Sequence, residues 1–259
     1  MGDCQILGES MKTIMLFLCA ALLSPVALAK EVKFLFSFAL PPYVINEAGK
    51  DPSGFEFEII REALASKGHT VKPVFVAMGA IPKLMAAKQA DGAQRGSPEL
   101  READGYFYAD DPTVIYQDVA ISLTSNKLAV GSVADLKDKS IIAFQGASHF
   151  LGPDFSAAVK GHQKYSETSD EKRRVMQLYA KGAQVYVGDI NVFKFYRASA
   201  SGVDTGQEIT VHKVFGQGTQ KINHAVFRDK QLRDDFNAGL KQLKSSGQYK
   251  HIVKKYVSE

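Results

Sequence analysis

The sequence predicts an α/β fold, in which strands and helices alternate along the chain. Residues 32–38 are almost continuously apolar, as expected of a strand that is buried on both faces of a sheet. A helical pattern begins at Phe55, a second strand spans residues 71–76, and Pro82 suits the first turn of a second helix. Because strands alternate with helices in this way, we expect a parallel sheet with helices on its faces.

The first helix has signals at both of its ends. Ser53 and Glu56 have the spacing of a capping box, in which each side chain bonds the backbone of the other residue. Apolar residues then recur at helical spacing as far as Leu64, and Gly68 suits the left-handed conformation that ends many helices. The sequence therefore predicts a helix that begins after Ser53 and ends before Gly68.

The same alternation continues in the second half without any repeat of sequence. A buried strand is predicted at residues 140–144, and a helix start follows directly at residues 145–148. Ser169 is placed to cap a further helix, and Asp189 opens another one after a strand at residues 185–187. Two later strands are predicted at residues 209–215 and 222–227.

The C-terminal tail contains the clearest helical pattern. Leu232, Phe236, Leu240 and Leu243 recur at spacings of four, four and three residues, and Gly247 separates them from a second amphipathic segment. Such helices can lie on a membrane surface, but packing against a protein core is the use we expect here.

The N-terminus resembles a secretory signal peptide. A charged start at Met11 and Lys12 is followed by an apolar run at residues 14–23 and a small-x-small end at Ala27 and Ala29. We therefore predict that residues 1–29 are a signal peptide and that the exported protein begins at residue 30. An uncleaved membrane anchor is the alternative, and either Met1 or Met11 can be the start.

Composition narrows the possible functions. The chain has 259 residues, 45% hydrophobic and 23% charged, which fits one large domain or two smaller lobes. The formal net charge is +4, and the basic residues are scattered, so we expect no nucleic-acid binding. Both cysteines, Cys4 and Cys19, precede the predicted cleavage site, which leaves the exported chain without a disulfide or a thiolate ligand. The histidines lack metal-ligand spacing, and we expect neither a metal nor a cofactor.

Residues 90–123 contain the most informative loop. A short strand there ends in a polar segment that carries Arg95, Ser97 and Arg101, and residues 118–123 have the alternation of a following strand. Loops at the carboxyl ends of strands are common ligand sites in α/β sheets. Because Glu99, Arg101 and Glu102 mix both charges, an ordinary solvated loop is the alternative.

Several short motifs, in their order and spacing, resemble one known family. They are Leu-Pro-Pro-Tyr at residues 40–43, Gly-Phe-Glu-Phe-Glu-Ile-Ile at 54–60, Ser-Pro-Glu-Leu-Arg at 97–101, Gln-Gly at 145–146, Val-Gly-Asp at 187–189 and Leu-Lys-Gln-Leu-Lys-Ser-Ser-Gly-Gln-Tyr at 240–249. The chain resembles the bacterial extracellular solute-binding proteins that serve polar amino acid ABC importers (family 3 type). The likeness covers almost all of the chain after residue 29.

The resemblance implies a two-lobed α/β fold, the type II periplasmic-binding-protein fold, with a ligand cleft between the lobes. Lobe one would comprise residues 30–120 and 226–259, and lobe two residues 121–225. Two crossover strands, near residues 118–125 and 221–226, would join them.

The resemblance also implies where the carboxylate of an amino acid would bind. Arg101 would grip it with paired, charge-assisted hydrogen bonds. Ser97 would assist from lobe one, and the backbone N–H groups of Gly146, Ala147 and Ser148 would assist from lobe two.

The other candidate ligand-binding residues each have a second possible role. Asp189 would receive the ligand's ammonium group, but it can equally be the N-cap of a helix. Arg95 is the second candidate for the carboxylate. Aromatic side chains are candidate walls of the cleft, although each can equally be ordinary packing: Tyr43, Tyr106, Tyr108 and Phe150.

These inferences predict a periplasmic solute-binding protein that captures an amino acid or a related zwitterion for a membrane ABC permease. We expect it to be a monomer. The first alternative is a dehydratase-like enzyme on the same scaffold, with Glu167 or Asp170 as general acid if burial raises its pKa. The second is a soluble sensory module that reports to a membrane partner.

Overall fold

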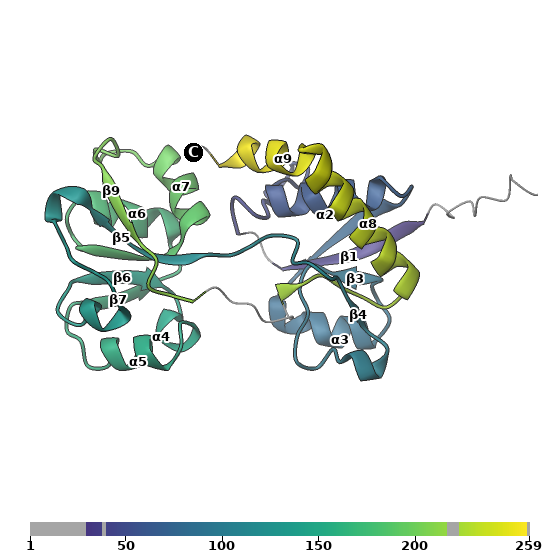
Figure 1. Cartoon of the computed structure of the whole chain (residues 1–259), viewed down its shortest axis with the longest axis horizontal. Coiled ribbons are helices and arrows are strands. Elements are labelled where there is room, and N and C mark those ends of the chain that lie inside the picture. The colour runs from purple at the N-terminus through teal and green to yellow at the C-terminus, as the bar shows by residue number, and fades with distance from the viewer. Residues whose placement is uncertain (1–29, 38–39, 217–222, 258–259) are drawn as a thin grey trace, which may run out of the picture.

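The computed structural model describes residues 30–37, 40–216 and 223–257. It has two lobes, each built on its own five-stranded sheet (Figure 1). The signal peptide predicted at residues 1–29 lies outside the described residues.

The sheet of lobe one has the strand order β2-β1-β3-β10-β4. Its strands are β1 (Glu31–Ser37), β2 (Thr70–Val76), β3 (Gly92–Ala93), β4 (Phe107–Tyr108) and β10 (Val226–Phe227). β1 runs parallel to β2 and β3, whereas β10 is antiparallel to both of its neighbours. The last strand therefore comes from the C-terminal part of the chain, which returns to the first lobe.

The helices of lobe one are α2 (Phe55–Ala65), α3 (Ile81–Ala86), α8 (Lys230–Ser246) and α9 (Gln248–Tyr256), with 3₁₀ turns η2 (Met78–Ala80) and η3 (Glu102–Asp104). The apolar stripe predicted for the tail is confirmed, because Leu232, Phe236, Leu240 and Leu243 are all buried in one cluster with residues of β1 and α2. α3 belongs to a separate cluster with Leu35 and Val226.

The sheet of lobe two has the strand order β7-β6-β8-β5-β9. Its strands are β5 (Asp118–Leu123), β6 (Ile141–Phe144), β7 (Tyr165–Thr168), β8 (Val185–Asp189) and β9 (Ile209–His212). Its helices are α4 (Ala147–Phe150), α5 (Pro153–Val159), α6 (Glu171–Tyr179) and α7 (Ile190–Ser199), with 3₁₀ turns η4 (Thr124–Asn126) and η5 (Val133–Leu136). Phe155 of α5 belongs to one core cluster, and Val175 of α6 and Phe193 of α7 belong to another.

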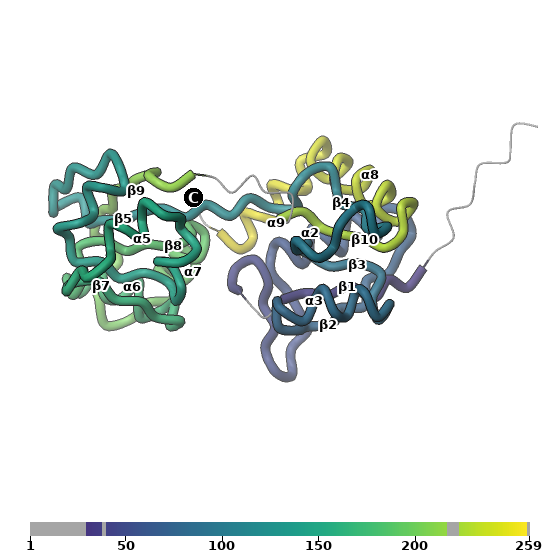
Figure 2. The backbone as a smooth tube through the Cα atoms, turned by 90° about the horizontal axis from the view of Figure 1, so that it is seen from below, coloured from purple at the N-terminus to yellow at the C-terminus, as the bar shows by residue number. Residues whose placement is uncertain are grey.

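The carboxyl ends of the parallel strands face the gap between the lobes. β1 runs toward lobe two, and α4, which follows β6, lies on the side of lobe two nearest lobe one (Figure 1). The tube in Figure 2 shows the same two bodies from below. The loops that follow these strands therefore lie on the sides of the two lobes that face each other (Figure 1).

The first crossover begins earlier than the sequence analysis expected. Residues 118–123 form β5, which pairs with β8 and β9 inside the second sheet. Residues 109–117, between β4 and β5, therefore carry the chain from one lobe to the other. The expected lobe boundary at residues 120 and 121 falls within β5. Residues 217–222, which include part of the expected second crossover, are outside the described residues.

Two predicted helix caps are wrong. Gly54, not Ser53, is the N-cap of α2, with a φ of 106° and no side-chain cap, while the backbone of Ser53 pairs with Ile45. A Cβ atom at Gly54 would lie 2.5 Å from the carbonyl oxygen of Tyr43, so this close approach requires glycine. In α6 the cap is Asp170 rather than Ser169, because it is the Asp170 carboxylate that accepts from the Arg173 N–H at 2.9 Å.

The contact between α2 and α8 depends on Gly239. A Cβ atom at this position would lie 2.0 Å from the carbonyl oxygen of Ala63, which is backbone and cannot move aside cheaply. The missing side chain therefore lets the C-terminal helix approach α2.

We predict that Gly239→Ala lowers the free energy of unfolding by about 1–3 kcal/mol, the usual cost of overpacking. Gly79→Ala is the matched control, because no heavy atom lies within 4 Å of its Cβ position. Thermal or urea unfolding followed by circular dichroism measures both variants. Equal stability of the two would contradict the close packing of α2 and α8.

Candidate functional site

Arg95 lies directly beyond β3, at the carboxyl end of the first sheet. Its guanidinium carbon is 4.0 Å from the centre of the Tyr116 ring, which is the geometry of a cation–π contact. Its Nε atom is buried and has no hydrogen-bond partner among the described residues. The guanidinium is thus held by an aromatic face, with donor capacity left over.

A buried carboxyl group, that of Glu56, lies beside Arg95. Its side chain is 1% exposed, it accepts a hydrogen bond from the Tyr116 hydroxyl, and Gln94 Nε2 donates to it at 3.5 Å. Burial raises the pKa of Glu56, although the charge of Arg95 and the Tyr116 hydrogen bond oppose that shift. Tyr116 therefore contacts both groups: its hydroxyl donates to the Glu56 carboxyl group, and its ring packs against the Arg95 guanidinium.

A cavity of about 250 Å³ opens next to Arg95. It is lined by Ser37, Leu40, Val44, Met78, Gln94, Arg95 and Tyr116. Met78 is 55% exposed, which is unusual for a methionine. An apolar hollow with one charged group is typical of sites for small polar molecules.

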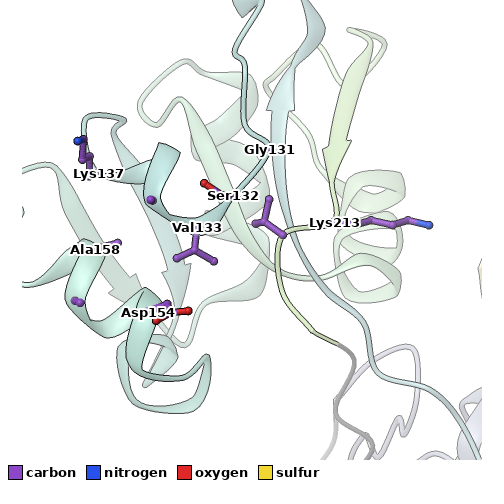
Figure 3. A pocket seen from close by; sticks show the side chains of 10 residues that line it. Gly131, Ser132, Val133, Lys137, Asp154, Ala158 and Lys213 are labelled. Carbon is purple, nitrogen blue, oxygen red and sulfur yellow. The ribbon is translucent and has the colours of Figure 1, made fainter.

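A larger hollow of about 660 Å³ lies on lobe two, between η5, α5 and the segment after β9 (Figure 3). The side chain of Lys213 points away from Val133 and Asp154, and the hydroxyl of Ser132 is engaged with Asp135. Because its polar groups do not converge, we regard the smaller cavity beside Arg95 as the better ligand site.

Arg101 lies on the surface rather than beside Arg95. Its side chain is 68% exposed and forms a two-pronged ion pair with Asp104, with Nε–Oδ2 and Nη2–Oδ1 distances of 2.7 and 3.0 Å. The backbone at Ser97 and Leu100 is tied down because the Tyr108 hydroxyl donates to both carbonyl oxygens. The two arginines of this loop are therefore engaged with different groups, Arg95 inside and Arg101 outside.

Tyr43 is completely buried, so it is not an exposed wall of a cleft in this structure. Its ring packs between those of Phe55 and Tyr116, at centre-to-centre distances of 4.5 and 4.3 Å. Its hydroxyl donates to Asp189 of lobe two at 2.8 Å. Tyr43 thus connects the lobes next to the first crossover.

Asp189 is the N-cap of α7 and uses both carboxylate oxygens inside the protein. Oδ1 accepts from the N–H groups of Asn191 and Val192 at 2.8 and 3.0 Å, and Oδ2 accepts from Tyr43 and from the Gln117 N–H, both at 2.8 Å. Burial raises its pKa, but these donors oppose the shift. Asp189 is therefore a helix N-cap, which was one of its two predicted roles. The other role, contact with a ligand's ammonium group, stays a prediction.

The loop at Gly146–Ser148 already holds a carboxylate. Glu167 of the edge strand β7 accepts hydrogen bonds from the N–H groups of Gly146 and Ser148 at 2.6 and 3.0 Å and from the Tyr165 hydroxyl at 2.6 Å. Desolvation alone would raise the pKa of Glu167, but these donors outweigh it and lower the pKa to about 2. The N–H groups expected to bind a ligand's carboxylate are thus occupied, and Ala147 between them is buried.

The position of Glu167 beside this loop is not predictable from the sequence. The register of β6 and β7, which pairs Ala143 with Glu167, brings it beside the loop that follows β6. Nothing in the local sequence shows that register, because the two strands are separated by α4 and α5. The general-acid alternative for Glu167 needed a raised pKa, and the lowered value contradicts it.

The chain matches a known protein family over almost all of its length after residue 31. A family model described as bacterial extracellular solute-binding proteins, family 3, matches residues 32–259. The chain belongs to this family. The resemblance noted in the sequence is confirmed, and with it the type II two-lobed fold. A search of curated proteins gave no match to this solute-binding protein.

Solved structures share the fold at low sequence identity. The L-cystine solute receptor of Neisseria gonorrhoeae, in an unliganded open conformation, is 16% identical with a TM-score of 0.66, and the match covers 90% of this chain and 95% of that one. A polar amino acid ABC uptake transporter substrate-binding protein from Streptococcus thermophilus is 18% identical with a TM-score of 0.66, over 89% and 86%. An ancestral cationic amino acid solute-binding protein is 18% identical with a TM-score of 0.65, over 90% and 97%.

Two negative findings apply to the described residues of this solute-binding protein. None of their helices is both long and apolar enough to cross a membrane. Within the same residues, no group of three or more histidine, cysteine, aspartate or glutamate side chains is placed to hold a metal ion.

The lowered pKa of Glu167 predicts sensitivity to acid. Because the folded-state pKa of about 2 lies below the ordinary value of 4.5, the ionised Glu167 stabilises the fold at neutral pH, and this contribution is lost as the pH falls from about 5 toward 2. We predict that Glu167→Gln is less stable than the wild type at pH 7 and that the difference shrinks by pH 3. Melting temperatures measured across this range test it, and a pH-independent difference would contradict it.

Proposed function

We propose that this protein captures a free amino acid, or a related zwitterion, between its two lobes and delivers it to the membrane permease of an ABC importer. The family and the amino acid-binding proteins among its structural neighbours support this proposal. The observation that carries it is Arg95, a partly unpaired guanidinium beside an apolar cavity of about 250 Å³ at the carboxyl end of the first sheet.

In this proposal Arg95 holds the ligand's carboxylate. A guanidinium fork matches a carboxylate in shape and charge, and its contact with Tyr116 keeps its plane fixed. Arg101 is the residue that the family resemblance favoured, but its fork is already paired with Asp104 on the surface. Arg95 has the better position for a ligand that enters between the lobes.

Asp189 and the loop at residues 146–148 keep secondary roles in the proposal. Their donors and acceptors are satisfied within the protein, so a ligand would have to displace Tyr43 or Glu167 to reach them. Ser97 lies two residues beyond Arg95 and keeps its proposed supporting role in this loop.

We infer that the protein works in the periplasm, since the family is extracellular and the sequence predicts a signal peptide. Binding rather than catalysis is the proposed activity. Of the two carboxylates considered as general acids, Glu167 has a lowered pKa and Asp170 caps α6.

Mass spectrometry of small molecules released from the purified, gently denatured protein tests the proposal. A stoichiometric amino acid or zwitterion, whose addition raises the melting temperature of the stripped protein, is the expected result. Conversion of that molecule into a product on incubation would support the enzyme instead.

We predict that Arg95→Ala weakens binding of the released ligand by roughly thirtyfold or more, because loss of one partner of a desolvated charge pair costs about 2–5 kcal/mol. Arg95→Lys should also bind poorly, since an ammonium cannot reproduce the fork. Arg101→Ala should bind within about twofold of the wild type, because Arg101 is exposed and paired with Asp104.

Isothermal titration calorimetry measures all three variants. Normal binding by Arg95→Ala, together with loss of binding in Arg101→Ala, would return the carboxylate to Arg101. Melting temperatures without ligand show whether Arg95→Ala, which leaves Glu56 without its counter-charge, still folds.

A further inference from the structure

The cavity beside Arg95 has an apolar wall. Among the described residues, this apolar wall consists of Leu40, Val44, Met78 and Tyr116. They come from three segments of chain: the turn after β1, the 3₁₀ turn η2 after β2, and the first crossover. Because β1 and β2 are parallel neighbours, the segments that follow them meet at one edge of the sheet. The fold therefore gathers apolar side chains from distant parts of the sequence around one small space.

One side of the apolar wall is fixed by the backbone. Leu40 and Val44 form an isolated bridge, in which the Val44 N–H donates to the Leu40 carbonyl oxygen at 3.1 Å. Val44 is 1% exposed, and Leu40 packs against the main core cluster of lobe one. This side of the wall is therefore rigid.

Met78 is the exposed part of the apolar wall. It begins η2, in the short connection between β2 and α3. A single exposed apolar side chain is common on protein surfaces, but this one lines a cavity. Because methionine is flexible and polarisable, its side chain can adapt to an apolar group of a ligand, and such a contact would remove apolar surface from water.

The polar side chains of the same cavity are largely paired within the protein. Gln94 Oε1 accepts from the Ser37 N–H at 3.1 Å, and Gln94 Nε2 donates to Glu56 at 3.5 Å. The Tyr116 hydroxyl also donates to Glu56. Arg95 is the one charged residue among the described lining residues, and the proposed function uses it for the ligand's carboxylate. Little hydrogen-bonding capacity is therefore left for a polar ligand side chain.

A charged ligand side chain fits this cavity poorly. A cationic one would lose hydration near the guanidinium of Arg95, with no acidic partner among the described lining residues. An acidic one would compete with the ligand's own carboxylate for the same guanidinium. An apolar one gives up no hydrogen bonds and buries its surface against the apolar wall.

We propose that the apolar wall is a subsite for the ligand's side chain, and that the protein therefore selects apolar amino acids of about the size of leucine or methionine. The cavity of about 250 Å³ lies below the range of roughly 300–1,000 Å³ that is usual for drug-sized ligands, which suits so small a molecule. This inference rests on the proposed function, in which Arg95 holds the ligand's carboxylate. It adds the chemical class of the side chain, which the proposed function leaves open.

Calorimetry with the ligand-stripped wild type is the first test. The probes are L-leucine, L-methionine, L-alanine, L-glutamine, L-lysine and L-glutamate, together with 4-methylpentanoate, which is leucine without its amino group. We expect L-leucine or L-methionine to bind more tightly than L-alanine and the three polar amino acids by about tenfold or more, because methylene groups in an apolar pocket are worth a factor of this order.

A matched pair of methionine variants tests the subsite itself. Met78→Gln makes an exposed side chain of similar length polar, so it should keep the fold and weaken binding of L-leucine and L-methionine by roughly fivefold. Binding of L-alanine, which offers little apolar surface to the wall, should change by less than about twofold. Met176→Gln is the control, because it makes the same change at a partly exposed methionine of α6 that does not line the cavity, and it should leave every probe unchanged.

The possible outcomes separate the subsite from the proposed function. Tightest binding of a polar amino acid, or an equal loss of every probe in Met78→Gln, overturns the subsite but leaves the proposed function intact. Unchanged binding of L-leucine and L-methionine by Met78→Gln also overturns the subsite alone. Binding of 4-methylpentanoate without any of the amino acids, weakened by Met78→Gln, overturns the proposed function but supports the subsite. Failure of every probe to bind overturns the subsite, and mass spectrometry of the released molecules then decides the proposed function by itself.

Discussion

The carboxylate of Asp189 connects lobe two, the first crossover and lobe one, and the arrangement of the two lobes depends on this connection. It accepts hydrogen bonds from the first turn of α7, from the Gln117 N–H in the first crossover and from the Tyr43 hydroxyl of lobe one. One side chain thus connects both lobes and the segment between them. Its neighbour across the β5–β8 pair is Asp118, whose pKa is raised to about 6 by burial and by the charge of Asp189. The junction is therefore a place where buried charge is concentrated.

Aromatic stacking extends this junction into lobe one. Tyr43 stacks on Tyr116, and Tyr116 in turn supports the guanidinium of Arg95 and donates to Glu56. Arg95 is thereby in contact with the same stack of rings that meets lobe two. These contacts link the guanidinium of Arg95 to Asp189 through two stacked rings.

Glu56 and Glu167 have pKa values that shift in opposite directions because their surroundings differ. Glu56 is buried beside Arg95, and its pKa is raised by burial. Glu167 is partly exposed, and its pKa is lowered because three close donors outweigh desolvation. The number of close donors, rather than burial alone, therefore decides the direction in which each of these two pKa values moves.

The sequence by itself determined the α/β class, the tail helices and the family, because apolar periodicity and the order of short motifs are local properties. It also identified Asp189 as the start of a helix. Only the tertiary structure decided which arginine lies beside a cavity. Arg95 and Arg101 are six residues apart in one loop, yet Arg95 packs on Tyr116 and Arg101 is exposed and paired with Asp104. Tertiary structure likewise decided that Glu167 occupies the loop at Gly146, because that contact depends on the register between two strands that are separated by two helices. Strand register is a property of the packed sheet, and no local pattern in this sequence specifies it.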